Sequence, residues 1–166
     1  MGRSRFREAV PHISMLFLGT ALLVLLHPIL GILYPLYFLG ATVWFWWRIC
    51  TNCLSHGSRS CPSGYGIVSS KLFKRSPHPD FRRAFRNNIG VIVVQFFIPP
   101  VFTIIFFVLP DLSWFYRIAG PFVFYPVVIF ILLIYSLDAF VWIPIHSRRK
   151  ACDTCPQRFD CAWMRR

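Results

Sequence analysis

The sequence predicts an all-α integral membrane protein in which four transmembrane helices form two hairpins with short cytoplasmic cysteine-rich loops. Three observations predict this fold class. First, 56% of the 166 residues are hydrophobic and they gather in long runs, and apolar runs of 18 or more residues indicate membrane spans. Second, only 14% of the residues are charged, against roughly 25% in soluble domains. Third, almost all basic residues are confined to three segments of the chain.

The apolar runs divide into four predicted spans that form a single domain. Residues 11–47 are almost continuously apolar, and as one helix they would measure about 55 Å, which is too long to cross a hydrocarbon core of about 30 Å once. Because Pro28 and Pro35 lie near the middle of this run and proline breaks or kinks a helix, we expect two spans joined by a tight turn. The predicted spans are residues 12–28, 31–48, 88–109 and 119–145, with cysteine-rich loops at residues 49–87 and 146–166.

The distribution of basic residues predicts the orientation of these spans. Of 18 Lys and Arg residues, 17 lie in the N-terminal segment, in the loop after the second span or in the C-terminal tail, and only Arg117 lies elsewhere. Four spans place those three segments on one face, which the positive-inside rule makes cytoplasmic together with both termini. Because no soluble domain offers a basic face to a nucleic acid, we assign the net charge of +12 to orientation and to anionic inner-leaflet lipids.

One basic stretch also has aromatic residues at helical spacing. Between Lys71 and Arg86, Phe81 and Phe85 lie four residues apart among arginines, so they share one face of a helix. This pattern is typical of a short helix that lies in the headgroup plane of a membrane. Pro77 and Pro79 would set the point where such a helix begins.

All six cysteines belong to two triads with the same pattern, C-x2-C followed by a third cysteine. A two-residue gap lets two thiolates face one metal ion, and a third thiolate nearby can complete the site. Each triad directly follows a predicted hairpin, so the halves resemble an architectural repeat. Two unrelated hairpins that each end in a metal-binding loop are an equal alternative. The predicted ligands are Cys50, Cys53 and Cys61 in the first triad and Cys152, Cys155 and Cys161 in the second.

The identity of the metal is less well determined by the sequence. Structural disulfides do not suit a reducing cytoplasmic location. An iron–sulfur cluster is favoured, because C-x2-C spacing and a proline after a ligand cysteine, as in Cys61-Pro62 and Cys155-Pro156, are typical of such sites. Zinc is the alternative, with His56 and His146 completing a Cys3His site in each half. Thiol chemistry without a metal is the third interpretation.

These observations predict a membrane-anchored redox module that passes electrons between a soluble donor and the bilayer or a protein partner, which includes a second copy of the chain. The alternatives are a zinc-stapled scaffold or complex subunit, a thiol oxidoreductase and a soft-metal transporter. The sequence contains no nucleotide-binding glycine loop and no plausible Ser-His-Asp arrangement. Nothing in it points to a hydrolase, and whether the protein is an enzyme stays open.

Two polar residues lie inside predicted spans. Asp138 is the only acidic residue within a span, and Gln95 lies at a similar depth in the third span. An acid inside a membrane is costly and usually has a partner or a function. We expect a hydrogen bond between the two helices, with Asp138 and Gln95 as a possible pair, and keep a proton relay or quinone-facing group as the functional alternative.

Overall fold

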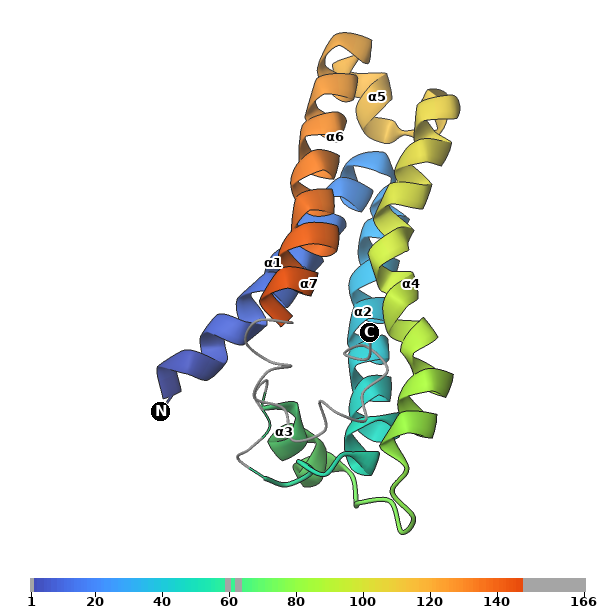
Figure 1. Cartoon of the computed structure of the whole chain (residues 1–166). Helices are drawn as coiled ribbons and strands as arrows, with labels where there is room; N and C mark the ends of the chain where they lie inside the picture. Colours follow the sequence, from blue (N-terminus) through green and yellow to red (C-terminus); the bar gives the residue numbers. More distant parts are fainter. Residues whose placement is uncertain (1, 59–60, 62–63, 148–166) are drawn as a thin grey trace. The chain divides into compact units, whose positions relative to one another are not determined.

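The structure of the protein is a computed structural model that describes residues 2–58, 61 and 64–147. Regular structure in this part of the chain is helical and includes no strand (Figure 1). The second predicted cysteine loop, from residue 148 onward, lies outside the described residues. The elements are α1 (Gly2–Leu26), α2 (Pro28–Arg48), the 3₁₀ turn η1 (Cys50–Asn52), α3 (Tyr65–Leu72), α4 (Phe81–Val108), the 3₁₀ turn η2 (Pro110–Leu112), α5 (Trp114–Ala119), α6 (Pro121–Ser136), the π-helical segment η3 (Leu137–Trp142) and α7 (Ile143–His146).

Among the described residues, three helical stretches are long and apolar enough to cross a membrane: Pro28–Asn52, Phe81–Val108 and Pro121–His146. A further apolar helix, Val10–Leu26, is shorter. Large apolar side chains remain exposed along these helices, for example Ile32, Leu36 and Leu39 on one side of α2. Exposed apolar surface on helices long enough to cross a bilayer is what lipid-facing segments present. The chain is therefore a membrane protein.

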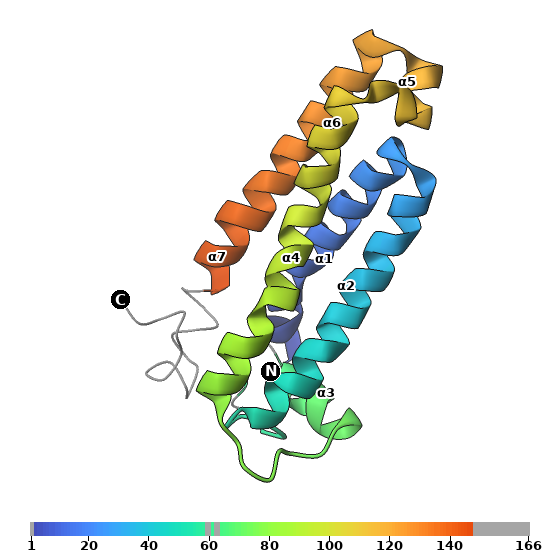
Figure 2. The same ribbon diagram turned by 90° about the vertical axis from the view of Figure 1, so that its right-hand side faces the viewer.

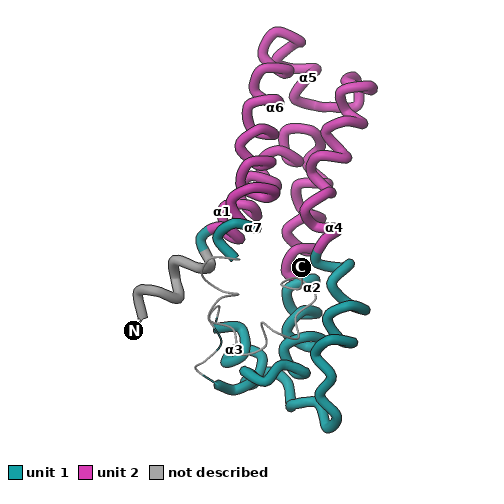
Figure 3. Tube along the Cα trace, viewed as in Figure 1, with its two compact units in different colours: residues 1–10, 40–92, 144–166 teal, residues 11–39, 93–143 magenta. Residues whose placement is uncertain are grey.

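The described residues fall into two compact units (Figure 3). The first, which we call the loop unit, comprises the described residues among 1–10, 40–92 and 144–166. The second, the helical unit, comprises residues 11–39 and 93–143. The helical unit contains an apolar core, which draws residues from α1, α2, α4, α6, η3 and the first residue of α7: Met15, Leu22, Leu23, Leu26, Tyr34, Phe38, Phe106, Phe124, Val128, Tyr135, Ala139 and Ile143.

Within the helical unit, α1 and α2 approach each other closely at two glycines. A Cβ atom added to Gly19 would lie 2.6 Å from the ring of Tyr34, and one added to Gly31 would overlap the side chain of Val24. Only His27 separates the two helices, and these contacts pair the end of α1 with the start of α2, so the chain reverses direction at His27 (Figure 2). Pro28 suits the first position of α2, because a helix leaves that N–H unpaired in any case.

Ser113 fixes the opposite connection, between α4 and α6, to the end of α1. The side chain of Ser113 is fully buried. Its Oγ accepts a hydrogen bond from the N–H of Tyr116 at 3.3 Å and donates one to the carbonyl oxygen of Leu25 at 3.1 Å. The indole Nε1–H of Trp114 donates to the carbonyl oxygen of Val24 at 2.6 Å. Because serine is a favoured N-cap, the same residue starts α5 and holds it against α1.

The separate surface helix predicted between Lys71 and Arg86 does not form. Lys71 belongs to α3, whereas Phe81 and Phe85 lie on the first turns of α4, with ring centroids 5.6 Å apart. Asp80 explains where α4 begins, because its Oδ1 accepts the N–H of Arg83 at 2.9 Å and so caps the helix. Helix α4 therefore begins at Phe81, ahead of the predicted start of the third span at residue 88, and its first turns occupy the end of the segment predicted as a loop, residues 49–87.

Candidate functional site

The first cysteine triad lies in a compact loop at the end of α2, in the loop unit. The short helix α3 folds back onto α2, because the hydroxyl of Ser69 donates to the carbonyl oxygen of Trp46 at 2.9 Å. The ring of Tyr65 packs against Trp46 with centroids 6.2 Å apart. As a result Cys50, in η1, is only 6% exposed. The loop is thus a folded structure in which the first cysteine is buried.

Backbone amides donate to two of the three sulfur atoms. The N–H of Ser55 donates to Sγ of Cys53, and the N–H of Gly66 donates to Sγ of Cys61, each at 3.4 Å. Cys50 lies close enough to both other cysteines for charges on the sulfurs to interact. Hydrogen bonds from the protein to sulfur are outer-shell contacts that orient and tune metal-bound thiolates. The loop therefore provides part of the environment that a thiolate metal site needs.

Two glycines explain why the sequence folds this way. Gly64, which directly precedes α3, has a φ of +73°. Glycine adopts this left-handed backbone conformation without the steric cost of a side chain. Gly66 lies so close to the carbonyl group of Ser55 that a Cβ atom would overlap its oxygen, and the same Cβ would lie 3.2 Å from Cβ of Cys61. The approach of α3 to the cysteines thus depends on the absence of a side chain at Gly66.

The two histidines predicted as ligands share an unusual feature. Nε2 of His56 and Nε2 of His146 are both buried and have no hydrogen-bond partner among the described residues. A buried polar atom without a partner costs free energy, and an unpaired imidazole nitrogen is the form that binds a metal ion. Two residues lie between Cys53 and His56, and five lie between His146 and Cys152. Each histidine is therefore close in sequence to one triad, and its ligand role stays a prediction.

The described residues do not include a formed metal site. No three His, Cys, Asp or Glu side chains in this part of the chain are arranged to hold one metal ion. The ligands predicted in the second triad, Cys152, Cys155 and Cys161, lie outside the described residues. Metal coordination by either triad stays a prediction, and binding would require the donors of the first triad to move closer together.

A second candidate site is the polar group around Asp138, in the helical unit. The hydroxyl of Ser14 donates to Oδ2 of Asp138 at 2.6 Å and also lies 2.9 Å from the carbonyl oxygen of Pro11. Asp138 is 8% exposed and belongs to the π-helical segment η3, and π-helical turns are frequent at functional sites. Sequence reasoning gave no indication of Ser14, because a single serine in an apolar helix does not disclose which distant residue it faces.

Gln95 does not pair with Asp138. Its side-chain Oε1 is buried without a hydrogen-bond partner in the described structure. Its backbone carbonyl oxygen instead accepts hydrogen bonds from the hydroxyls of Tyr34, at 3.5 Å, and Tyr135, at 3.3 Å. The expected bond between helices exists, but the partner of Asp138 is Ser14 on α1.

Comparisons with protein-family models, with curated proteins and with solved structures each find no match to this chain.

Proposed function

We propose that the chain is a membrane-anchored metal-binding protein in which each cysteine triad and its neighbouring histidine form a Cys3His site. The main support is that His56 and His146, each close in sequence to one triad, have a buried Nε2 atom without a hydrogen-bond partner in the described structure. Three thiolates and one imidazole make up a common ligand set for zinc in tetrahedral structural sites. Zinc at the first site would fasten α3 to the end of α2 and would order the loop as a docking surface for a protein partner or a second copy.

Cys50, Cys53, Cys61 and His56 would hold the metal in the first site, and Cys152, Cys155, Cys161 and His146 in the second. The bound metal supplies a rigid cross-link between its four donors. The protein's part is to present the sulfurs, and the amides of Ser55 and Gly66 already donate to two of them. Such contacts fix the orientation of the ligands and are sensitive to mutation.

The proposed topology has four spans arranged as two hairpins, with both termini and both cysteine loops in the cytoplasm. The fourth span would be Val10–Leu26, about 25 Å long at 1.5 Å per residue. This is close to the hydrocarbon thickness of about 30 Å. The close contacts of Gly19 and Gly31 between α1 and α2 support the first hairpin, because small residues let membrane helices approach each other. The location of 17 of 18 basic residues supports the orientation.

A second candidate function is an electron-transfer module with iron–sulfur clusters on the same cysteines. The C-x2-C spacing and the prolines that follow Cys61 and Cys155 favour it. Hydrogen bonds to sulfur, as at Cys53 and Cys61, are among the features that set the reduction potential of a cluster. In this case the cysteines would pass electrons to or from the membrane or a partner protein.

Elemental analysis of the full chain, purified in detergent under anaerobic conditions, tests the proposal. We expect two zinc ions per chain and no absorption in the visible range. Iron in near-stoichiometric amount with acid-labile sulfide and a brown colour would instead establish the second candidate. A chain that contains neither metal and that fails to take up either after reconstitution would overturn both.

The role of His56 is tested separately by comparing His56→Gln with His78→Gln. His78 lies in the same connection between α2 and α4 but is not a predicted ligand, so it is a matched control. We expect His56→Gln to lower zinc affinity at the first site at least tenfold in chelator competition, and His78→Gln to leave it unchanged. Equal affinities in the two variants would remove His56 from the ligand set.

A further inference from the structure

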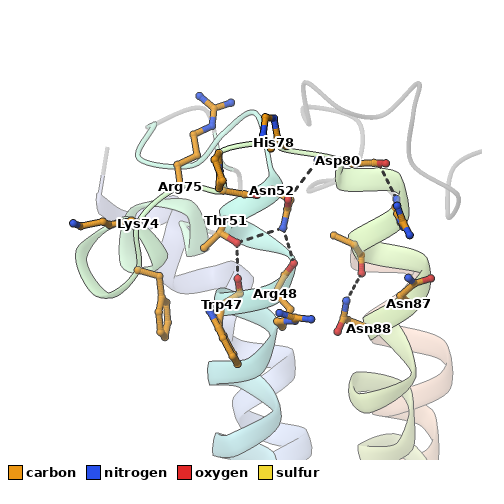
Figure 4. Close-up of a pocket in the computed structure, with 15 residues that line it drawn as sticks. Trp47, Arg48, Thr51, Asn52, Lys74, Arg75, His78, Asp80, Asn87 and Asn88 are labelled. Atoms are coloured by element: carbon orange, nitrogen blue, oxygen red, sulfur yellow. Dashed lines mark hydrogen bonds between the residues drawn. The ribbon is translucent and has the colours of Figure 1, made fainter.

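A large cavity lies within the loop unit, between the end of α2 and the start of α4 (Figure 4). Its volume is about 760 Å³, within the range of roughly 300–1,000 Å³ that is usual for small-ligand sites. Three segments line it: the last turn of α2 with η1, the connection after α3, and the first two turns of α4. None of the predicted metal ligands lines this cavity.

The side chains that line the cavity are strongly basic. Arg48, Lys74, Arg75 and Arg83 supply four cations, and Asp80 is the one carboxylate among the lining residues. Asp80 is already engaged, because its Oδ1 accepts the N–H of Arg83 and caps α4. The cavity therefore has an excess of positive charge and of N–H donors. Its complementary ligand is an anion with several oxygen atoms, since guanidinium groups bind phosphate through paired hydrogen bonds.

Backbone and side-chain contacts hold the walls of the cavity in place. The amide of Asn52 donates to the carbonyl oxygen of Arg48 at 3.0 Å, and its Oδ1 accepts the N–H of Asp80 at 3.4 Å (Figure 4). The N–H of Ser76 donates to the carbonyl oxygen of Thr51 at 3.1 Å. These bonds tie the connection after α3, and the residue that precedes α4, to the end of α2. The basic side chains thus project from an ordered frame.

The position of Arg48 places the cavity at the edge of a membrane. Its guanidinium lies 5.5 Å from the ring centre of Trp44 and 5.1 Å from that of Trp47, and Trp47 also lines the cavity. Both tryptophans are exposed near the end of a candidate span, and tryptophan is enriched where a span meets the headgroups. An anion bound in this cavity would lie at the level of the lipid headgroups. If the anion is the headgroup of a lipid, the acyl chains of that lipid can extend into the adjacent hydrocarbon.

We propose that this cavity binds the phosphate-bearing headgroup of an anionic phospholipid. Basic pockets between membrane helices near the bilayer surface are sites of this kind. Arg48 on α2 and Arg83 on α4 contact the phosphate from two walls, and Lys74 and Arg75, which line the cavity from the connection after α3, add to its positive charge. The proposal does not rest on metal binding by the cysteines, because the lining residues and the predicted ligands are different.

Native mass spectrometry of the full chain in detergent tests the proposal. The protein is titrated with phosphatidylglycerol, with phosphatidylcholine and with inorganic phosphate. We expect phosphatidylglycerol to bind at least tenfold more tightly than either of the others. Comparable binding of phosphatidylcholine would overturn the requirement for an anionic lipid. Binding of inorganic phosphate as tight as that of the lipid would identify a soluble phosphate compound as the ligand.

Two double variants separate the cavity from general attraction between charges. Arg48→Gln with Arg83→Gln removes two lining cations, whereas Lys71→Gln with Arg82→Gln removes the same charge from residues that do not line the cavity. At about 1 kcal/mol for each basic residue, the first variant should bind phosphatidylglycerol about 25-fold more weakly, and the second should change by less than threefold. Equal losses in the two variants would overturn the proposal. Arg48→Lys with Arg83→Lys, which keeps the charge, should bind within about fivefold of the original chain and guards against loss by misfolding.

Discussion

Gly66→Ala tests the packing of the cysteine loop, because the structure has no space for an added Cβ atom at this position. Its Cβ would overlap the carbonyl oxygen of Ser55 and lie 3.2 Å from Cβ of Cys61. Overpacking of this kind costs about 1–3 kcal/mol, and alanine returns at most about 1 kcal/mol through its higher helix propensity. We expect the folded loop to lose about 1–2 kcal/mol, which corresponds to about 5- to 30-fold in the equilibrium between open and closed loop at 1.4 kcal/mol for each factor of ten.

The reactivity of Cys50 measures this opening. Cys50 is 6% exposed in the folded loop, so a thiol reagent reaches it mainly when the loop opens. When opening and closing are fast relative to reaction, the rate of modification follows the population of the open form. The metal-free full chain in detergent is treated with iodoacetamide, and modified Cys50 is quantified by peptide mass spectrometry. We expect Gly66→Ala to raise the rate about 5- to 30-fold.

Gly90→Ala is the matched control for this experiment. Gly90 lies in α4, and a Cβ atom added there meets nothing within 4 Å. Alanine at this position should stabilise the helix by about 0.5–1 kcal/mol and leave the reactivity of Cys50 unchanged. If Cys50 in Gly66→Ala reacts within twofold of its rate in the original chain, or if Gly90→Ala raises the rate equally, the close contact between Gly66 and Ser55 does not hold the loop.

Three further predictions concern the helical unit, with stability measured by unfolding in mixed detergent and SDS. Gly31→Ala should lower the free energy of unfolding by about 1–3 kcal/mol, because its Cβ would overlap Val24. Gly40→Ala, on the same helix but with open space around it, should not lower this free energy. Equal effects of the two substitutions would contradict a close contact at Gly31. Ser14→Ala should lower the free energy of unfolding by about 0.6–1.7 kcal/mol, because it removes the hydrogen bond to Asp138. Asp138→Asn should lower it less, since the side-chain amide can still pair with Ser14. A larger loss in Asp138→Asn would argue against this hydrogen bond. Ser113→Ala should lower the free energy of unfolding by about 0.5–2 kcal/mol, because it removes the N-cap of α5 and the hydrogen bond to Leu25. An unchanged unfolding midpoint would show that the cap is dispensable.

Helix positions were predictable wherever composition changes abruptly. The predicted end of the second span, residue 48, coincides with the end of α2 at Arg48, because Arg48 is the first charge after a long apolar run. Helix α4 begins at Phe81, before the predicted start of the third span at residue 88. Residues 81–87 belong to the polar, basic segment that predicts a loop, but no proline lies between Phe81 and Val93 to break a helix. A helix therefore continues through polar residues that mark the edge of a membrane without marking its own end.

Features that depend on distant pairs had no local signal. Ser14 and Asp138 lie 124 residues apart, and neither residue type at its position implies the other. The π-helical segment that contains Asp138 looks like ordinary helix in sequence. It also weakens the idea of an architectural repeat, because α2 passes into the 3₁₀ turn η1, whereas α6 continues into η3 before its helix ends. Similar cysteine spacing does not require the preceding helices to end in the same way.

The short turn η1 belongs to both proposed sites, which gives their relation a physical basis. Cys50 opens this turn and is buried under α3, while Thr51 and Asn52 close it and line the basic cavity. Ordering of residues 73–80 by a bound headgroup would act on η1 through the bonds that Thr51 and Asn52 make with Ser76 and Asp80. Metal binding at Cys50 would act on the same turn from the other side. Because linkage between two ligands is reciprocal, any effect of lipid on metal affinity must equal the effect of metal on lipid affinity, and η1 is the element through which the two would communicate.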